Sequence, residues 1–146
     1  MRLLIVFLLL FVTAAQPARS ADFSGTWEID LRSPSERARK LECGSAYFEL
    51  AQSGDQITGS HSFAAVGCGR MNEGGPETVK GVVVNGVAVL AVTSGRNGAV
   101  VLGTAKLSGN KLHWQKVHEV RAGEPATDSP LILERGALSR AKQPSQ

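Results

Sequence analysis

Hydrophobic and polar residues alternate along most of the chain after position 22, and glycine-containing turns separate the alternating stretches. This period of two is typical of β-strands that bury one face. Phe48 and Leu50, for example, fall on one face of their segment, and Tyr47 and Glu49 fall on the other. The pattern predicts eight short strands, over residues 26–31, 46–52, 56–66, 78–84, 87–94, 99–107, 111–121 and 131–135.

The turns between these segments indicate an antiparallel meander. Asn85-Gly86 is a strong hairpin signal, because a type I′ turn needs positive φ at both central positions. No amphipathic helix is expected beyond a turn or two within residues 35–41. Eight antiparallel strands can close into a barrel with room for one small ligand. We therefore predict an all-β fold, an eight-stranded antiparallel up-and-down barrel, in one domain over residues 22–140 with a flexible tail over 141–146.

Loop lengths distinguish the two ends of the predicted barrel. Tight turns emerge at one end, over residues 53–55, 85–86 and 108–110. Long connections emerge at the other end, over residues 32–45, 67–77 and 122–130, together with the shorter glycine-rich connection 95–98. Because binding residues concentrate on loops held by a rigid scaffold, we expect the functional end to be the one with the long loops.

The first residues are typical of a secretory signal peptide. Arg2 is the only charged residue before an apolar run from Leu3 to Ala15, and small residues follow. The run is shorter than the ~20 residues that a spanning helix needs. The small residues favour cleavage after Ala18-Arg19-Ser20-Ala21, with Thr13-Ala14-Ala15 as the alternative. We predict that residues 1–21 are removed and that a periplasmic or secreted protein without a stable membrane anchor remains.

Charge gives no reason to expect a nucleic-acid partner. The full chain has 16 Lys and Arg against 13 Asp and Glu, a net charge of +3. Removal of Arg2 and Arg19 with the leader leaves 14 basic and 13 acidic residues, a net charge of +1. The basic character is thus partly a property of the leader, and no nucleic-acid binding is expected.

The two cysteines, Cys43 and Cys68, are predicted to form a disulfide, since an even pair in an exported chain most simply pairs. The bond would join two of the long loops at the open end. The chain has no Cys-x-x-Cys and its histidines are far apart, so no metal site is expected. Hydrolase, phosphate-binding and zinc-protease motifs are absent from the sequence, so no enzymatic activity, catalytic residue or cofactor is predicted.

Two short motifs resemble the lipocalin and avidin group of calycin-like barrels. They are Gly25-Thr26-Trp27 in the first strand and Gln56-Ile57-Thr58-Gly59 after a Gly-Asp turn. The resemblance implies that Trp27 closes the barrel end opposite the long loops. It also implies that a basic residue from the last strand or just beyond, Arg135 or Arg140, packs across this tryptophan. The several tryptophans of the avidin biotin site are not matched, so biotin binding is not implied.

Seven polar or aromatic residues are candidates for ligand binding at the open end. Arg70 and Asn72 lie in the polar connection 67–77, and Arg96 lies in the glycine-rich turn 95–98. Trp114 shares a strand face with Lys116 and His118, which would approach the mouth if that face points inward. His61, in mid-strand, is either a core histidine or a ligand group.

Two functions are compatible with these residues. The first is an exported carrier of a small apolar or anionic molecule, bound at the loop end of the barrel. The alternative is a module that uses the same loops to bind or inhibit another envelope protein, with a packed barrel interior. The small residues Ala88, Ala91, Gly103 and Ala105 bear on this choice, because they leave a cavity only if they point inward.

Overall fold

A computed structural model describes residues 21–142 of the chain. Of the predicted signal peptide only Ala21 lies in this range, and residues 143–146 of the predicted tail lie outside it. The described chain contains one short helix, α1 (Pro34–Ala38). Its strands are β1 (Gly25–Asp30), β2 (Cys43–Ser53), β3 (Gln56–Val66), β4 (Met71–Glu73), β5 (Val79–Val84), β6 (Val87–Thr93), β7 (Val100–Ser108), β8 (Lys111–Arg121) and β9 (Arg135–Arg140).

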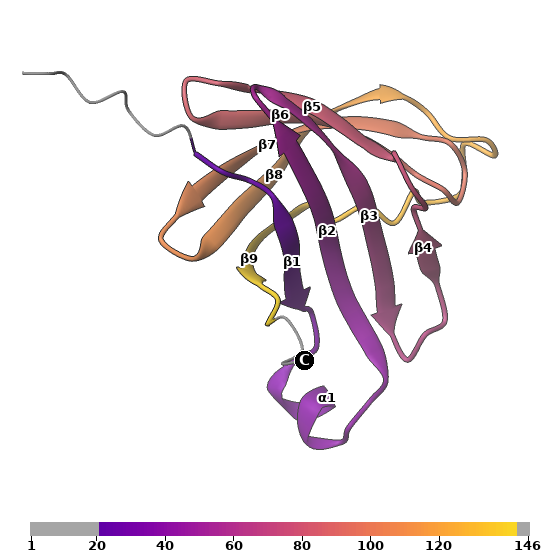
Figure 1. The fold of residues 1–146 in the computed structure, drawn as a ribbon. Coiled ribbons are helices and arrows are strands. Elements are labelled where there is room, and N and C mark those ends of the chain that lie inside the picture. The colour runs from indigo at the N-terminus through magenta and orange to yellow at the C-terminus, as the bar shows by residue number, and fades with distance from the viewer. Residues whose placement is uncertain (1–20, 143–146) are drawn as a thin grey trace, which may run out of the picture.

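Eight of the nine described strands close into a barrel (Figure 1). The order around the barrel is β1, β2, β3, β5, β6, β7, β8 and β9, and β9 pairs with β1 to close it. Every pairing is antiparallel. The predicted eight-stranded antiparallel barrel is therefore confirmed, and its architecture is consistent with a calycin-like fold.

The last predicted strand is displaced in the structure. The prediction placed it at residues 131–135, whereas β9 spans Arg135–Arg140. The apolar run Leu131-Ile132-Leu133 is not extended strand, because Leu131 has a positive φ of 49° and the neighbouring Ile132 and Leu133 are both buried. Adjacent residues of a strand point to opposite faces, so this run buries its side chains in another way.

A ninth strand, β4, was not predicted. It lies within the connection 67–77 and pairs only with β3, through Ser62↔Glu73, Phe63↔Asn72 and Ala64↔Met71. Its burial pattern is exposed, buried, exposed, so that Asn72 alone points toward the protein. The strand fixes this residue in place at the loop end of the barrel.

Trp27 and Arg140 close the barrel end from which the tight turns emerge. Trp27 is 1% exposed and donates a hydrogen bond from Nε1 to the Phe23 carbonyl at 2.8 Å. The guanidinium carbon of Arg140 lies 4.3 Å from the centre of the Trp27 ring, a cation–π distance. Of the two basic residues that the resemblance suggested, Arg140 thus takes this position, and Arg135 is exposed.

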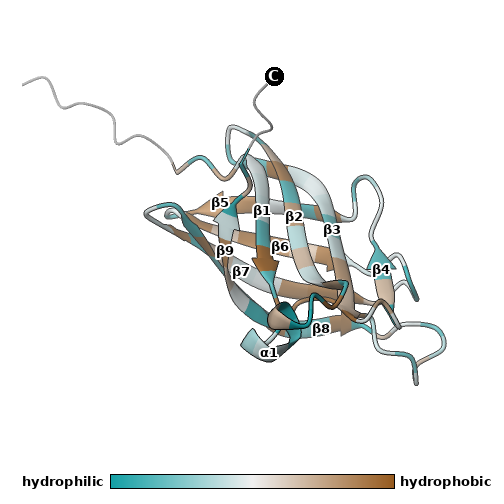
Figure 2. Cartoon of the chain, turned by 90° about the horizontal axis from the view of Figure 1, so that it is seen from below, coloured by the Kyte–Doolittle hydropathy of each residue, from teal (hydrophilic) through white to brown (hydrophobic). Residues whose placement is uncertain are grey.

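The disulfide between Cys43 and Cys68 is present, as predicted, with a Cα–Cα distance of 5.3 Å. It ties the start of β2 to the turn after β3, next to α1. Ser33 and Glu36 cap α1 reciprocally, but the helix buries no residue. Its hydrophilic colour in Figure 2 agrees with this exposure. The helix and the disulfide therefore belong to the rim of the barrel and not to its core.

Three of the four small residues of the middle strands point inward, but a large ring occupies the space that they leave. Ala88, Gly103 and Ala105 are buried, whereas the outward Ala91 is partly exposed. A Cβ atom placed on Gly103 would lie 2.1 Å from Trp114 Cη2, so the indole fills the place of a side chain. The Trp114 ring also packs on Phe48, with ring centres 5.0 Å apart. The interior of the barrel is therefore packed around Trp114.

We expect loss of the disulfide to lower the stability without changing the fold. Replacing Cys43 and Cys68 by Ala should lower the free energy of unfolding by about 3 kcal/mol, since the bond closes a loop of 25 residues. Urea unfolding of the oxidised wild type and of the variant measures this difference. Reduced wild type should match the variant, and equal midpoints for the oxidised protein and the variant would contradict the prediction.

A second prediction concerns the contact between Gly103 and Trp114. Gly103→Ala should destabilise the protein by about 1–3 kcal/mol, because the new methyl overlaps the indole and the barrel wall must shift. Gly69→Ala is the matched control, since Gly69 has open space around its Cβ position and no positive φ. Thermal unfolding of both variants tests this expectation. Equal midpoints for the two would show that Trp114 does not fill the barrel as described.

Candidate functional site

A stretch of the chain covers the loop end of the barrel. Residues 128–133, called the mouth segment below, lie between β8 and β9. In Figure 1 the yellow chain that leads to β9 runs across the barrel behind β2 and β3. Ile132 and Leu133 are 5% and 4% exposed and belong to the barrel core. The mouth segment therefore fills the position at which the sequence predicted a ligand.

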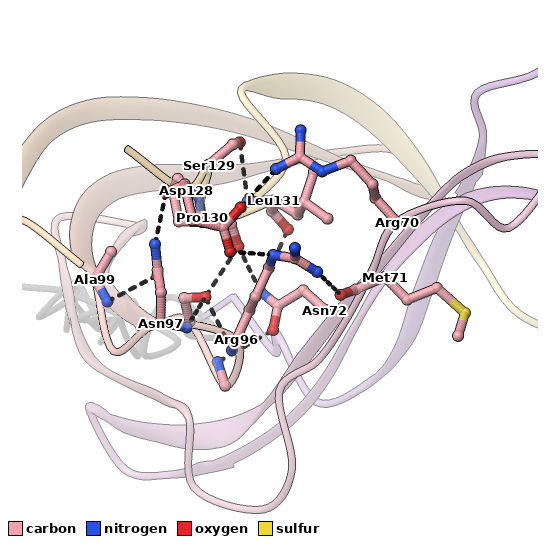
Figure 3. A network of polar contacts seen from close by, with 12 residues as sticks. Arg70, Met71, Asn72, Arg96, Asn97, Ala99, Asp128, Ser129, Pro130 and Leu131 are labelled. Atoms are coloured by element: carbon pink, nitrogen blue, oxygen red, sulfur yellow. Dashed lines mark hydrogen bonds and ion pairs between the residues drawn. The ribbon is translucent and has the colours of Figure 1, made fainter. Parts of the chain in front are cut away.

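Arg70 and Arg96 hold the first residue of the mouth segment. Arg96 Nε and Arg70 Nη2 lie 2.6 and 2.9 Å from the two carboxylate oxygens of Asp128 (Figure 3). The hydrogen bond from Arg96, with that from Arg70, lowers the pKa of Asp128 below its usual value. Arg96 also donates to the Met71 carbonyl at 3.4 Å. Two residues predicted to bind an anion thus bind a carboxylate of their own chain.

Asn72 uses its whole amide at this end of the barrel. The side chain is 1% exposed, and its Nδ2 donates to the carbonyls of Pro130 at 2.9 Å and Leu131 at 3.3 Å. Its Oδ1 accepts a hydrogen bond from the Gly95 amide at 3.1 Å. One buried side chain therefore joins β4, the turn after β6 and the mouth segment (Figure 3).

Two residues of the turn after β6 add to this network. Ser94 Oγ donates to the Pro130 carbonyl at 3.0 Å, and Asn97 Nδ2 donates to the Asp128 carbonyl at 2.7 Å. Asn97 Oδ1 in turn accepts from the Ala99 amide at 3.2 Å. In this turn the sequence indicated only Arg96 as a candidate. Asp128, Ser94 and Asn97 were missed because a polar residue in a loop carries no sign of its distant partner.

Trp114 and His61 contact the last residue of the mouth segment. Trp114 is 2% exposed, points inward, and donates a hydrogen bond from Nε1 to the Leu133 carbonyl at 2.6 Å. His61 is 1% exposed, and its Nε2 accepts a hydrogen bond from the Leu133 amide at 3.4 Å. Within the described chain, the buried Nδ1 of His61 has no hydrogen-bond partner.

Burial sets the charge of His61. Desolvation lowers the pKa of the imidazole from 6.5 to about 4, because the charged form loses hydration in the apolar interior. His61 is therefore neutral at pH 7. Since its Nε2 accepts the Leu133 amide, the proton of the neutral ring is assigned to Nδ1. The ring also packs on Phe48, with ring centres 4.8 Å apart.

The structure does not bring Lys116 and His118 into the barrel mouth. The Lys116 ammonium pairs with the Glu134 carboxylate, which is largely exposed. His118 is exposed because a bulge at Val117 interrupts the alternation of β8, with Gly103 opposite Lys116 and Leu102 opposite His118. Five of the seven candidate residues thus converge on the mouth segment: His61, Arg70, Asn72, Arg96 and Trp114.

A cleft of about 680 Å³ lies on the outer wall of the barrel. It is lined by outward side chains of β2 and β3, including Tyr47 and Glu49, and by residues 73–77. The cleft lies outside the wall, and its lining includes His61 and the residues that follow Asn72. Over residues 21–142, no group of three or more His, Cys, Asp or Glu residues is arranged to hold a metal ion.

Comparison with known proteins does not assign the chain to a family. No protein-family model matches it, and the search of curated proteins finds no significant similarity. The likeness to calycin-like barrels therefore rests on the strand count and on their antiparallel closure. No helix of the described residues has the length and apolar character needed to cross a bilayer.

The buried His61 predicts a specific pH dependence of stability. In the unfolded chain its pKa is near 6.5, and in the folded protein it is about 4, so the unfolded state takes up a proton first as the pH falls. The free energy of unfolding should therefore fall by roughly 3 kcal/mol in total as the pH is lowered through this window. The lowered pKa of Asp128 acts at lower pH, because its ordinary value is 3.8.

Urea unfolding at several pH values between 7 and 4 measures this effect. His61→Gln keeps a hydrogen-bond acceptor for the Leu133 amide but does not titrate, so it should flatten the pH dependence. His113→Gln, at an exposed histidine, should leave the wild-type dependence unchanged. An unchanged slope in His61→Gln would show that the buried histidine is not its source.

Proposed function

We propose that this protein is an extracytoplasmic protein-interaction or inhibitor module that engages its partner through the loop end of the barrel. The observation that carries this proposal is the network around Asp128. Residues that the sequence suggested for ligand binding, Arg70, Asn72 and Arg96, instead fix the mouth segment across the barrel. Such cross-linking holds the loop end in one conformation in the isolated molecule.

Rigidity favours protein recognition. Loops that are already fixed in their bound conformation lose little entropy on binding, and preorganised inhibitors depend on this property. Here the disulfide, the two Asp128 ion pairs and the buried Asn72 amide tie the loop-end connections to one another. Exposed side chains at this end, Arg39 and Met71 among them, remain available to a partner.

A small-molecule carrier, the first hypothesis from the sequence, is less well supported. A carrier needs room inside the barrel for its ligand. Here the side chains of Trp114, Ile132 and Leu133 occupy the interior next to the mouth. An extracytoplasmic location is part of the proposal. It is supported by the signal-like leader and by the disulfide, which is typical of oxidising compartments.

Native mass spectrometry of the protein isolated from its own host tests the proposed function. We expect a co-purified protein and not a co-purified small molecule. Arg39→Glu at the loop end should weaken that complex at least about ten-fold, since it reverses a charge at the proposed surface. Lys106→Glu, an exposed charge reversal near the opposite end, is the matched control and should leave the complex unchanged. A bound small molecule, or equal loss with Lys106→Glu, would contradict the proposal.

A further inference from the structure

The barrel holds the mouth segment through its main chain, as a receptor would hold a bound peptide. Four backbone carbonyls of the segment accept hydrogen bonds from barrel side chains, those of Asp128, Pro130, Leu131 and Leu133. One backbone amide, that of Leu133, donates to His61. Contacts to the main chain give affinity for any extended segment, and pockets for side chains give specificity.

Three of the groups that make these contacts also have partners outside the mouth segment. Asn72 is 1% exposed and is oriented by the Gly95 amide. Ser94 is 2% exposed, and its Oγ accepts hydrogen bonds from the Arg96 and Asn97 amides. Trp114 is wedged against Gly103. A site whose side chains are already held in place needs little reorganisation to accept another chain.

The mouth segment does not satisfy this site completely. Leu131 adopts a positive φ of 49°, a left-handed conformation that is unfavourable for a leucine. The hydrogen bond from the Leu133 amide to His61 is long, at 3.4 Å, and His61 Nδ1 is left without a partner in the described chain. A different segment that avoids this strain and reaches Nδ1 would fit the same groups better.

Two side-chain subsites define what such a segment must carry. Arg70 and Arg96 form a subsite for one carboxylate, filled by Asp128. The barrel interior next to Trp114 takes two consecutive apolar side chains, filled by Ile132 and Leu133. The carboxylate therefore precedes the apolar pair by four and five residues.

We propose that the barrel mouth is a peptide-binding site that the protein's own mouth segment occupies in the isolated molecule. Its second occupant is a segment of a partner protein, with a carboxylate residue followed four and five positions later by two apolar residues. This inference rests on the proposed function, because it names the chemistry of the partner. The partner's segment, held in place by the partner's other contacts with the loop end, displaces residues 128–133 and takes over their hydrogen bonds.

Competition with a tethered segment determines how the proposal is tested. A segment joined to the barrel at both ends has an effective concentration in the millimolar range or above, so a free peptide does not displace it from the wild type. The double variant Asp128→Ala/Ile132→Ala weakens the internal segment and leaves the receptor side chains intact. Asp55→Ala/Ile57→Ala is the matched control, because it removes the same residue types near the opposite end.

The probe is a fluorescein-labelled peptide with the sequence of residues 127–134, followed by fluorescence anisotropy. We expect binding to Asp128→Ala/Ile132→Ala with a Kd on the order of 10–100 µM, and none at these concentrations to the wild type or the matched control. A peptide with Asn in place of its Asp should bind about ten-fold more weakly, because Arg70 and Arg96 lose their carboxylate. A peptide change cannot unfold the protein, so this comparison isolates the site.

Absence of binding to a folded Asp128→Ala/Ile132→Ala variant, or equal binding of the two peptides, would overturn the proposal. If that variant does not fold, hydrogen exchange of the wild type decides instead. The Leu133 amide should then exchange at least ten-fold faster than the Leu90 amide of β6, through opening of the mouth segment alone. Equal rates would mean that the segment opens only with the whole protein, and the inference would fail. The native mass spectrometry test stays separate, because Arg39 lies outside residues 128–133 and its variant tests the loop end whether or not the mouth segment is displaced.

Discussion

Closing an eight-stranded sheet removes its edges but leaves two ends through which water can reach the apolar interior. This constraint determines most of the structure. At one end an indole, Trp27, covers the core and a guanidinium, Arg140, covers the indole. At the other end the core is covered by the mouth segment, which buries Ile132 and Leu133. The first seal is local, whereas the second needs partners from several loops.

The polar groups at the loop end follow from that second seal. A segment buried across a barrel mouth brings backbone carbonyls with it, and each must find a donor away from water. Asn72, Ser94 and Asn97 supply these donors, and Arg70 and Arg96 neutralise the carboxylate of Asp128. The same chemistry that keeps the barrel closed is also the chemistry of peptide recognition. The same side chains therefore account for closure of the barrel and for the proposed binding of a peptide.

The sequence predicted features that depend on local periodicity and missed those that depend on contacts between distant residues. Alternating residues and the Asn85-Gly86 turn were enough to predict the barrel, and loop lengths placed Arg70, Asn72 and Arg96 at one end. The run Leu131-Ile132-Leu133 was predicted as strand because a short apolar run is equally typical of a buried strand and of a buried segment without regular structure. The bulge that turns His118 outward has no signal of its own, since Val117 is an ordinary strand residue.

The contact of Arg140 with Trp27 also has a consequence for how the chain reaches its native state. It joins the first strand to the last, because β1 pairs with β9 and the Arg140 guanidinium also donates to the Ser24 carbonyl. While the polypeptide is synthesised, β1 emerges early, and its partner β9 emerges after the other described strands. The barrel cannot close until almost the entire chain is free. The order of the strands thus makes closure of the barrel a late event in folding.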